Sequence, residues 1–128
     1  MTITIGYDFE KNQIIKNEPY KMNKDEIDVI NAILKKLDLD ASDFKIVKPC
    51  EDYTTLQYKE RDLFRLKYTE KAKWIKILIF PSYKNDYIDN PLFSKQKNKN
   101  QVFWQSYIEN IFDYNEIILR AVNEIKKA

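Results

Sequence analysis

Two consecutive stretches of the chain, residues 63–68 and 73–80, alternate apolar and polar side chains in period two. Only the four residues 69–72 separate them. Such alternation is typical of β-strands that bury one face, and so short a connection makes neighbouring strands antiparallel. One buried face also fixes the register, because a slip of one residue would turn every side chain over. The pattern therefore predicts that Leu66 lies opposite Ile75 and Lys67 opposite Trp74.

In this register one face of the two strands is apolar and the other carries cations and an indole. The apolar face holds Phe64, Leu66, Ile75, Ile77 and Ile79. The opposite face holds Arg65, Lys67, Trp74 and Lys76. Phosphate backbones attract cations and nucleobases stack on aromatic rings, so this face is the candidate binding surface. The alternative is an ordinary antiparallel sheet with one solvated face.

The rest of the sequence extends this pair into a larger α+β fold. Residues 44–48 and 53–58 also read as strands, and a turn at 59–61 places Leu56 opposite Phe64, which gives an antiparallel meander. At the start of the chain, alternation over residues 3–9 followed by Ile14 and Ile15 predicts an N-terminal hairpin. We expect the meander to pack against an N-terminal helix and one or two C-terminal helices.

Helical spacing of apolar residues locates these helices. Asn23 followed by Glu26 resembles a capping box, and apolar residues then recur with helical period to Leu37, which predicts a helix over 24–37. A second helix is expected over 114–127, introduced by Asp113 and Glu116. Mixed helical spacing suggests a further helix over 102–112. Phe103 and Trp104 are expected to belong to its core face, the alternative being platforms on which bases stack.

The 128 residues are expected to form one domain spanning 1–128. Hydrophobic residues make up 44% of the chain and aromatic residues 14%, enough apolar surface for one core. No apolar run is long enough to span a bilayer, and the first residues lack the pattern of a signal peptide. We therefore expect a cytoplasmic protein without a membrane partner. A single cysteine, Cys50, excludes an internal disulfide.

Residues 81–100 read as a long loop that ends in a basic segment carrying Lys95, Lys97 and Lys99. The segment is either a solvated loop or a basic arm that contacts phosphates. Tyr53, Tyr83 and Tyr87, which fall in or near loops, are either half-buried or part of a protein-binding surface.

The chain lacks residue types that many enzymes use in catalysis or to bind nucleotides. It has no histidine and only one glycine, Gly6, which removes His-assisted nucleophiles and glycine-rich phosphate loops. We expect no catalytic residue, no metal site and no cofactor. A divergent metal-dependent nuclease using Asp43, Asp86 or Asp89 is the residual enzymatic alternative.

These observations favour a small non-enzymatic binding protein. Residues 44–100 carry 13 basic and 7 acidic side chains, so the positive charge lies in the middle of the chain. The expected partner is nucleic acid or a nucleic-acid-handling protein of the host. Abundant Ile, Lys, Asn and Tyr, which have A/T-rich codons, suggest a phage or mobile-element origin. The alternative is therefore an inhibitor of anti-defence or immunity type that blocks a host nuclease by protein contact. The oligomeric state is not readable.

Overall fold

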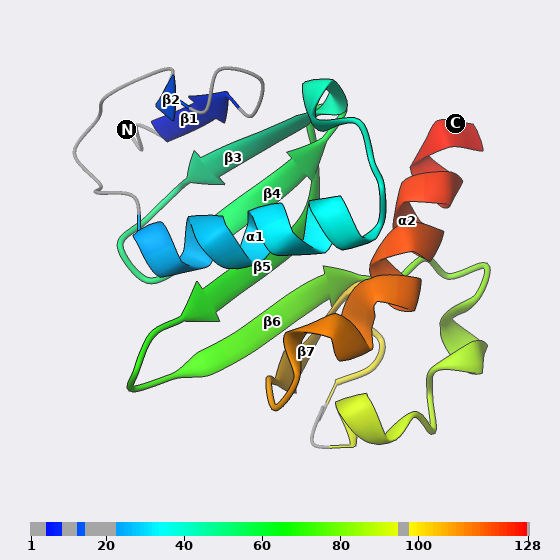
Figure 1. Cartoon of the computed structure of the whole chain (residues 1–128). Coiled ribbons are helices and arrows are strands. Elements are labelled where there is room, and N and C mark those ends of the chain that lie inside the picture. Colours follow the sequence, from blue (N-terminus) through cyan, green and yellow to red (C-terminus); the bar gives the residue numbers. More distant parts are fainter. Residues whose placement is uncertain (1–4, 9–12, 15–22, 95–97, 128) are drawn as a thin grey trace.

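The computed structural model describes residues 5–8, 13–14, 23–94 and 98–127. Its centre is an antiparallel sheet of seven strands in the order β2-β1-β3-β4-β5-β6-β7 (Figure 1). The strands are β1 (Ile5–Asp8), β2 (Gln13–Ile14), β3 (Phe44–Lys48), β4 (Thr54–Tyr58), β5 (Arg61–Tyr68), β6 (Lys73–Leu78) and β7 (Phe103–Tyr107). The N-terminal hairpin and the α+β meander predicted from the sequence are confirmed.

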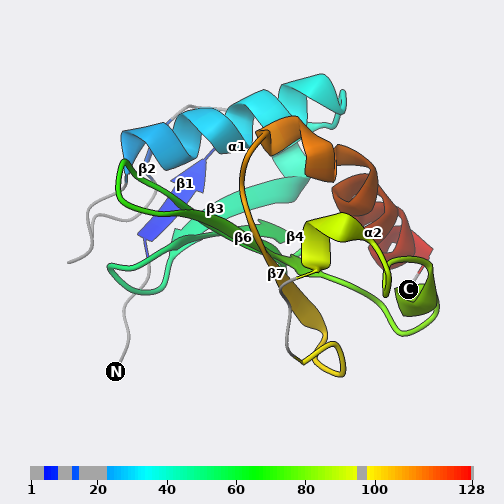
Figure 2. The ribbon, with the colours of Figure 1, turned by 90° about the horizontal axis from the view of Figure 1, so that it is seen from below.

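Two α-helices, α1 (Lys24–Lys36) and α2 (Asn115–Lys127), cover one face of the sheet. Figure 2 shows both helices on the same side of the strands. The side chain of Asn23 caps α1 by accepting a hydrogen bond from the backbone N–H of Glu26 at 3.1 Å, as the sequence predicted. The core lies between the helices and the sheet, where Ile30, Leu66 and Ile118 are fully buried.

The predicted strand register is confirmed at all three pairs: Leu56 with Phe64, Leu66 with Ile75, and Lys67 with Trp74. The turn between β4 and β5 differs from the expected one, because it is a two-residue turn at Lys59 and Glu60 that pairs Tyr58 with Arg61. An irregularity next to Leu56 restores the predicted register by giving β5 one extra residue, Leu63.

The helix predicted over residues 102–112 is wrong. Residues Phe103–Tyr107 form β7, which pairs with β6, and Ile111–Tyr114 form a short 3-10 helix, η4, that leads into α2. Trp104 is fully buried in the core, as expected, but Phe103 points to the other face of the sheet and is half-buried. Side chains in residues 103–107 thus alternate between the two faces of the sheet instead of forming one apolar face of a helix. Among the described residues, α2 is the one C-terminal α-helix.

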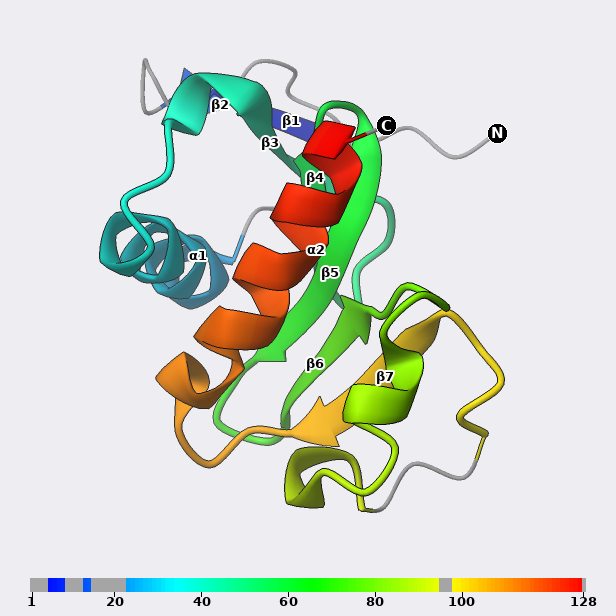
Figure 3. The ribbon, with the colours of Figure 1, turned by 90° about the vertical axis from the view of Figure 1, so that its right-hand side faces the viewer.

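Residues 81–94 of the segment expected to be a long loop pack against the rest of the fold. They contain two 3-10 turns, η2 (Lys84–Asp86) and η3 (Pro91–Phe93), and Figure 3 shows them beside β7. Tyr83 and Tyr87 are 4% and 7% exposed, and Phe93 is fully buried, with its ring nearly perpendicular to that of Trp104 at a centroid distance of 5.5 Å. These tyrosines stabilise the core and do not form an exposed binding surface.

Candidate functional site

The face of the sheet opposite the two helices carries all four strand residues singled out in the sequence. Because side chains alternate along a strand, Arg65 and Lys67 of β5 project from the same face as Trp74 and Lys76 of β6. Arg65 pairs with Lys76, and Lys67 pairs with Trp74. All four side chains are partly accessible to solvent, whereas Leu66 and Ile75 between them are fully buried.

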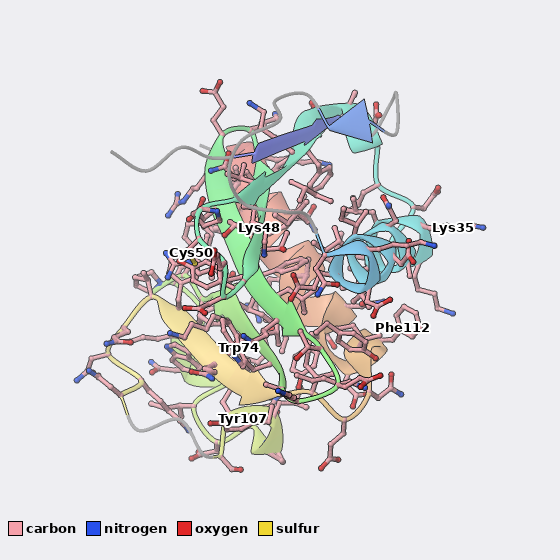
Figure 4. All side chains as sticks on the ribbon, turned by 90° about the vertical axis from the view of Figure 1, so that its left-hand side faces the viewer. Lys35, Lys48, Cys50, Trp74, Tyr107 and Phe112 are labelled. Carbon is pink, nitrogen blue, oxygen red and sulfur yellow. The ribbon has the colours of Figure 1, made fainter. Side chains whose placement is uncertain are left out.

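Three aromatic residues that sequence reasoning did not place there extend this surface. Tyr53 precedes β4, while Phe103 and Tyr107 lie on β7. Tyr107 is 61% exposed, and Figure 4 shows Tyr107 and Trp74 on the side of the sheet away from Lys35 of α1. The seven residues are called the aromatic–cation face below: Tyr53, Arg65, Lys67, Trp74, Lys76, Phe103 and Tyr107.

Cations and rings alternate in space on the aromatic–cation face. The guanidinium carbon of Arg65 lies 4.7 Å from the ring centroid of Phe103 and 5.8 Å from that of Tyr53. The ammonium nitrogen of Lys76 lies 5.9 Å from the ring of Trp74. The rings of Tyr53 and Trp74 are themselves 5.9 Å apart, tilted by 56°. Such contacts hold long cationic side chains close to the sheet while leaving their charge unneutralised.

Only one of the three cations has an acidic partner in the described part of the chain. A guanidinium nitrogen of Arg65 lies 3.7 Å from Asp62, whose carboxylate also accepts a hydrogen bond from Gln57 at 2.9 Å. Neither Lys67 nor Lys76 forms a salt bridge with a described carboxylate. The pair of Arg65 and Asp62 is partly exposed and therefore contributes little free energy, while Lys67 and Lys76 keep their charges unpaired by a described carboxylate. The face therefore remains cationic.

An open hollow adjoins the cations at the β7 end of the aromatic–cation face. Its volume is ≈ 390 Å³. Arg65, Lys76, Gln101, Val102 and Phe103 line it. Charged, amide and apolar groups meet there, so the hollow suits a ligand that combines an anionic group with a flat apolar one.

A buried polar network on the helix side fixes the loop that carries Tyr53. The ammonium group of Lys48 lies 3.4 Å from the carbonyl oxygens of both Glu51 and Tyr53, and 3.8 Å from the carboxylate of Glu26. Glu26 in turn accepts hydrogen bonds from the hydroxyl of Thr54 at 2.7 Å and from the backbone N–H of Tyr68 at 2.9 Å. Helix α1 is thereby tied to β4 and β5 beneath the candidate site.

The phenol of Tyr53 stays protonated at neutral pH. Its burial raises its pKa above the ordinary value, and the nearby positive charge of Arg65 opposes this shift without reversing it. The aromatic–cation face therefore offers a neutral hydroxyl beside its cations.

The basic loop contributes less to this site than the sequence suggested. Lys95 and Lys97 lie outside the described residues. The ammonium group of Lys99 donates a hydrogen bond to the backbone carbonyl of Ile88 and lies 6.0 Å from the ring of Trp104. Lys99 is thus held by its own loop, beside a ring that belongs to the core and away from the aromatic–cation face.

The carboxylates considered for metal catalysis are not gathered together. Asp86 forms a salt bridge of 2.9 Å with Arg120 of α2. Within residues 5–8, 13–14, 23–94 and 98–127, no group of three or more His, Cys, Asp or Glu side chains could hold a metal ion. None of the helices in the described part of the chain has the length and apolar character that crossing a membrane requires.

Comparison with protein-family models, curated proteins and solved structures finds no match for this chain. The chemistry of the aromatic–cation face is therefore the ground for a functional proposal. It combines three cations with four aromatic rings on one surface of the sheet.

Proposed function

We propose that this protein is a small non-enzymatic binding module that engages nucleic acid through the aromatic–cation face. The observation that carries this proposal is the placement of Arg65, Lys67 and Lys76 among aromatic rings on the sheet surface opposite both helices. Nucleic acids present the two complementary features, a closely spaced row of negative charges and flat apolar bases. A solvated sheet face built only for solubility does not need large aromatic side chains.

The charge distribution supports the same partner. Residues 44–100, which supply most of the sheet, carry six more basic than acidic side chains, whereas residues 1–43 carry 6 basic and 9 acidic ones. Such an asymmetry steers a polyanion towards the middle of the chain. Contacts of cations to phosphates fix no base sequence, so binding is expected to be salt-dependent and weakly sequence-specific.

Fluorescence anisotropy with labelled random-sequence oligonucleotides tests the proposal directly. The triple variant R65A/K67A/K76A removes the three cations of the face. The matched control K24A/K35A/K126A removes three exposed cations from the helix layer, so both variants carry the same net charge. We expect the face variant to bind at least tenfold more weakly than the wild type and the control to bind within about twofold of it. Equal affinities in all three proteins, or no binding by the wild type, would overturn the proposal.

A protein partner is the competing outcome. Affinity capture from a host lysate, with and without nuclease treatment, separates the two cases. A partner lost on nuclease treatment supports nucleic acid. A protein partner that remains bound in stoichiometric amount after nuclease treatment, together with no direct binding of oligonucleotides, would overturn the proposal. It would favour the alternative, an inhibitor that blocks a host nuclease by protein contact.

A further inference from the structure

We infer that the aromatic–cation face takes single-stranded nucleic acid, with bases stacked along one row of side chains and phosphates held by the next row. The inference rests on the proposed function and names the class of nucleic acid that fits it. It follows from the order in which the strand register places rings and cations across the sheet.

Three of the four aromatic residues belong to one row that crosses β5, β6 and β7 and continues to the residue before β4. Lys67 pairs with Trp74, and Trp74 pairs with Tyr107. On the other side of β5, Thr54 pairs with Leu66, so Tyr53 continues the row next to Lys67. Tyr53, Trp74 and Tyr107 therefore form a line perpendicular to the strands, interrupted only by a lysine.

The neighbouring row on the same face is polar and cationic. Thr55 pairs with Arg65, Arg65 with Lys76, and Lys76 with Gln105. It lies two residues along each strand from the aromatic row, a separation of about 7 Å. A strand of nucleic acid laid across the sheet can place its bases on the first row and its phosphates on the second.

This arrangement discriminates against a duplex. In double-stranded nucleic acid the faces of the bases are hidden in the stack, so a sheet surface reaches only phosphates, sugars and base edges. The aromatic rings of the face would then have no base on which to stack. In a single strand the faces of the bases are available, and stacking on aromatic side chains adds to the phosphate contacts. Each stacked base is worth roughly five- to a hundredfold in affinity.

The accessibility of the rings points to Tyr107 as the first stacking platform. Its side chain is 61% exposed on the edge strand β7. Trp74 is half-buried, with the ammonium nitrogen of Lys76 and the ring centroid of Tyr53 each 5.9 Å from its ring centroid. A phosphate that draws the ammonium group of Lys76 aside would leave the indole ring accessible to a base.

The two tryptophans make the stacking step observable. Trp104 is fully buried and its indole N–H donates a hydrogen bond of 2.7 Å to the carbonyl of Gln101. Trp74 is thus the tryptophan that a ligand on the aromatic–cation face could reach. Quenching of tryptophan emission by an unlabelled oligonucleotide reports a base that reaches Trp74.

The test compares a 12-nucleotide oligothymidine with a 12-base-pair DNA duplex in the same buffer, using the full chain. Tyr107→Leu removes the exposed ring of the face. Phe112→Leu, which removes an exposed ring beside Lys36 on the helix side, is the matched control. We expect the wild type to bind the single strand at least tenfold more tightly than the duplex and to lose tryptophan emission on binding. Tyr107→Leu should weaken single-strand binding at least fivefold and leave duplex binding unchanged.

The outcomes separate this inference from the proposed function. Duplex binding as tight as single-strand binding, or tight single-strand binding that is indifferent to Tyr107→Leu and quenches no tryptophan emission, would overturn the inference and leave nucleic-acid binding in place. No binding to either oligonucleotide would overturn both. An effect of Phe112→Leu equal to that of Tyr107→Leu would also contradict a stacking row on the aromatic–cation face.

Discussion

The ammonium nitrogen of Lys48 lies 3.4 Å from the backbone carbonyl oxygen of Tyr53. Lys48 is 5% exposed and projects to the helix side of the sheet, while the ring of Tyr53 lies beside Trp74 on the opposite side. A buried charge pair between Lys48 and Glu26 thus sits directly behind the candidate binding surface. The stability of the core and the shape of the face depend on the same network.

Replacing Glu26 should be strongly destabilising. Glu26→Ala removes the acceptor of Thr54 and Tyr68 and leaves the ammonium of Lys48 buried without its carboxylate, which should cost about 3 kcal/mol or more. The double variant E26A/K48M should lose less than the sum of the two single losses, because no uncompensated charge remains. Urea denaturation measures these free energies of unfolding. Asp28→Ala on the exposed side of α1 is the control, with a change within about 0.5 kcal/mol.

The turn between β4 and β5 can be stabilised by substitution. Lys59 and Glu60 both have positive φ angles, of 49° and 67°, which glycine and asparagine adopt more readily than other residues. K59N/E60G should therefore raise the free energy of unfolding by about 0.5–1 kcal/mol. The same pair of residues placed at Glu70 and Lys71, where φ is not positive, should bring no gain. Equal effects at both turns would contradict this backbone geometry.

Stability should fall at alkaline pH because of Tyr83. Burial raises the pKa of this phenol to about 12, above its ordinary value of 10.0. Below pH 10 the phenol is neutral in both states and its contribution to stability is fully present. Between pH 10 and 12 the unfolded chain ionises first, so the free energy of unfolding should fall by about 1.4 kcal/mol per pH unit.

Tyr83→Phe isolates this contribution. Burial also raises the pKa values of Tyr53 and Tyr114, and those groups remain in the variant. Chemical denaturation between pH 9 and pH 12 should therefore show a shallower alkaline loss in Tyr83→Phe than in the wild type. Parallel curves would mean that Tyr83 titrates normally.

Arg120 of α2 holds residues 83–87, in the segment after β6, against the helix. It forms the 2.9 Å salt bridge to Asp86, donates a 3.4 Å hydrogen bond to the hydroxyl of Tyr87, and stacks 4.4 Å from the ring centroid of Tyr83. Arg120→Ala should speed hydrogen exchange in residues 83–93, while Lys126→Ala on the same helix should not. Unchanged exchange would show that the buried tyrosines hold the segment without Arg120.

The parts of the fold that could be predicted from the sequence are those in which apolar residues recur regularly on one face of an element. The β5–β6 register was predictable because Leu66 and Ile75 are apolar and are flanked by Arg65, Lys67 and Lys76, with Trp74 as the one uncharged neighbour. Strand β7 was missed because only Trp104 and Gln105 follow the expected alternation of buried apolar and solvent-facing polar residues. It sends Phe103 and Tyr107 to the solvent-facing side and Ser106 to the core, where the serine hydroxyl lies 2.7 Å from that of Tyr114. A polar residue satisfied by a distant partner cannot be recognised from local alternation.

The candidate site was predictable in part for the same reason. Arg65, Lys67, Trp74 and Lys76 lie on two adjacent strands and were placed by alternation alone. Tyr53 and Tyr107 join them only through pairing across four strands, which the sequence does not reveal. Glu26 was interpreted as a capping residue, yet its carboxylate bonds to Thr54 and to Tyr68 across the core. Long-range pairing therefore decides which residues share the face.

The salt dependence of binding is the most direct measurement of the central claim that the aromatic–cation face binds nucleic acid. The logarithm of the association constant for single-stranded DNA should fall linearly with the logarithm of salt concentration, by roughly 0.7 for each phosphate neutralised. We predict that R65A/K67A/K76A reduces this slope by about 2 and that K24A/K35A/K126A leaves it unchanged. The same slope in all three proteins would contradict the account, because the phosphates would then be bound elsewhere.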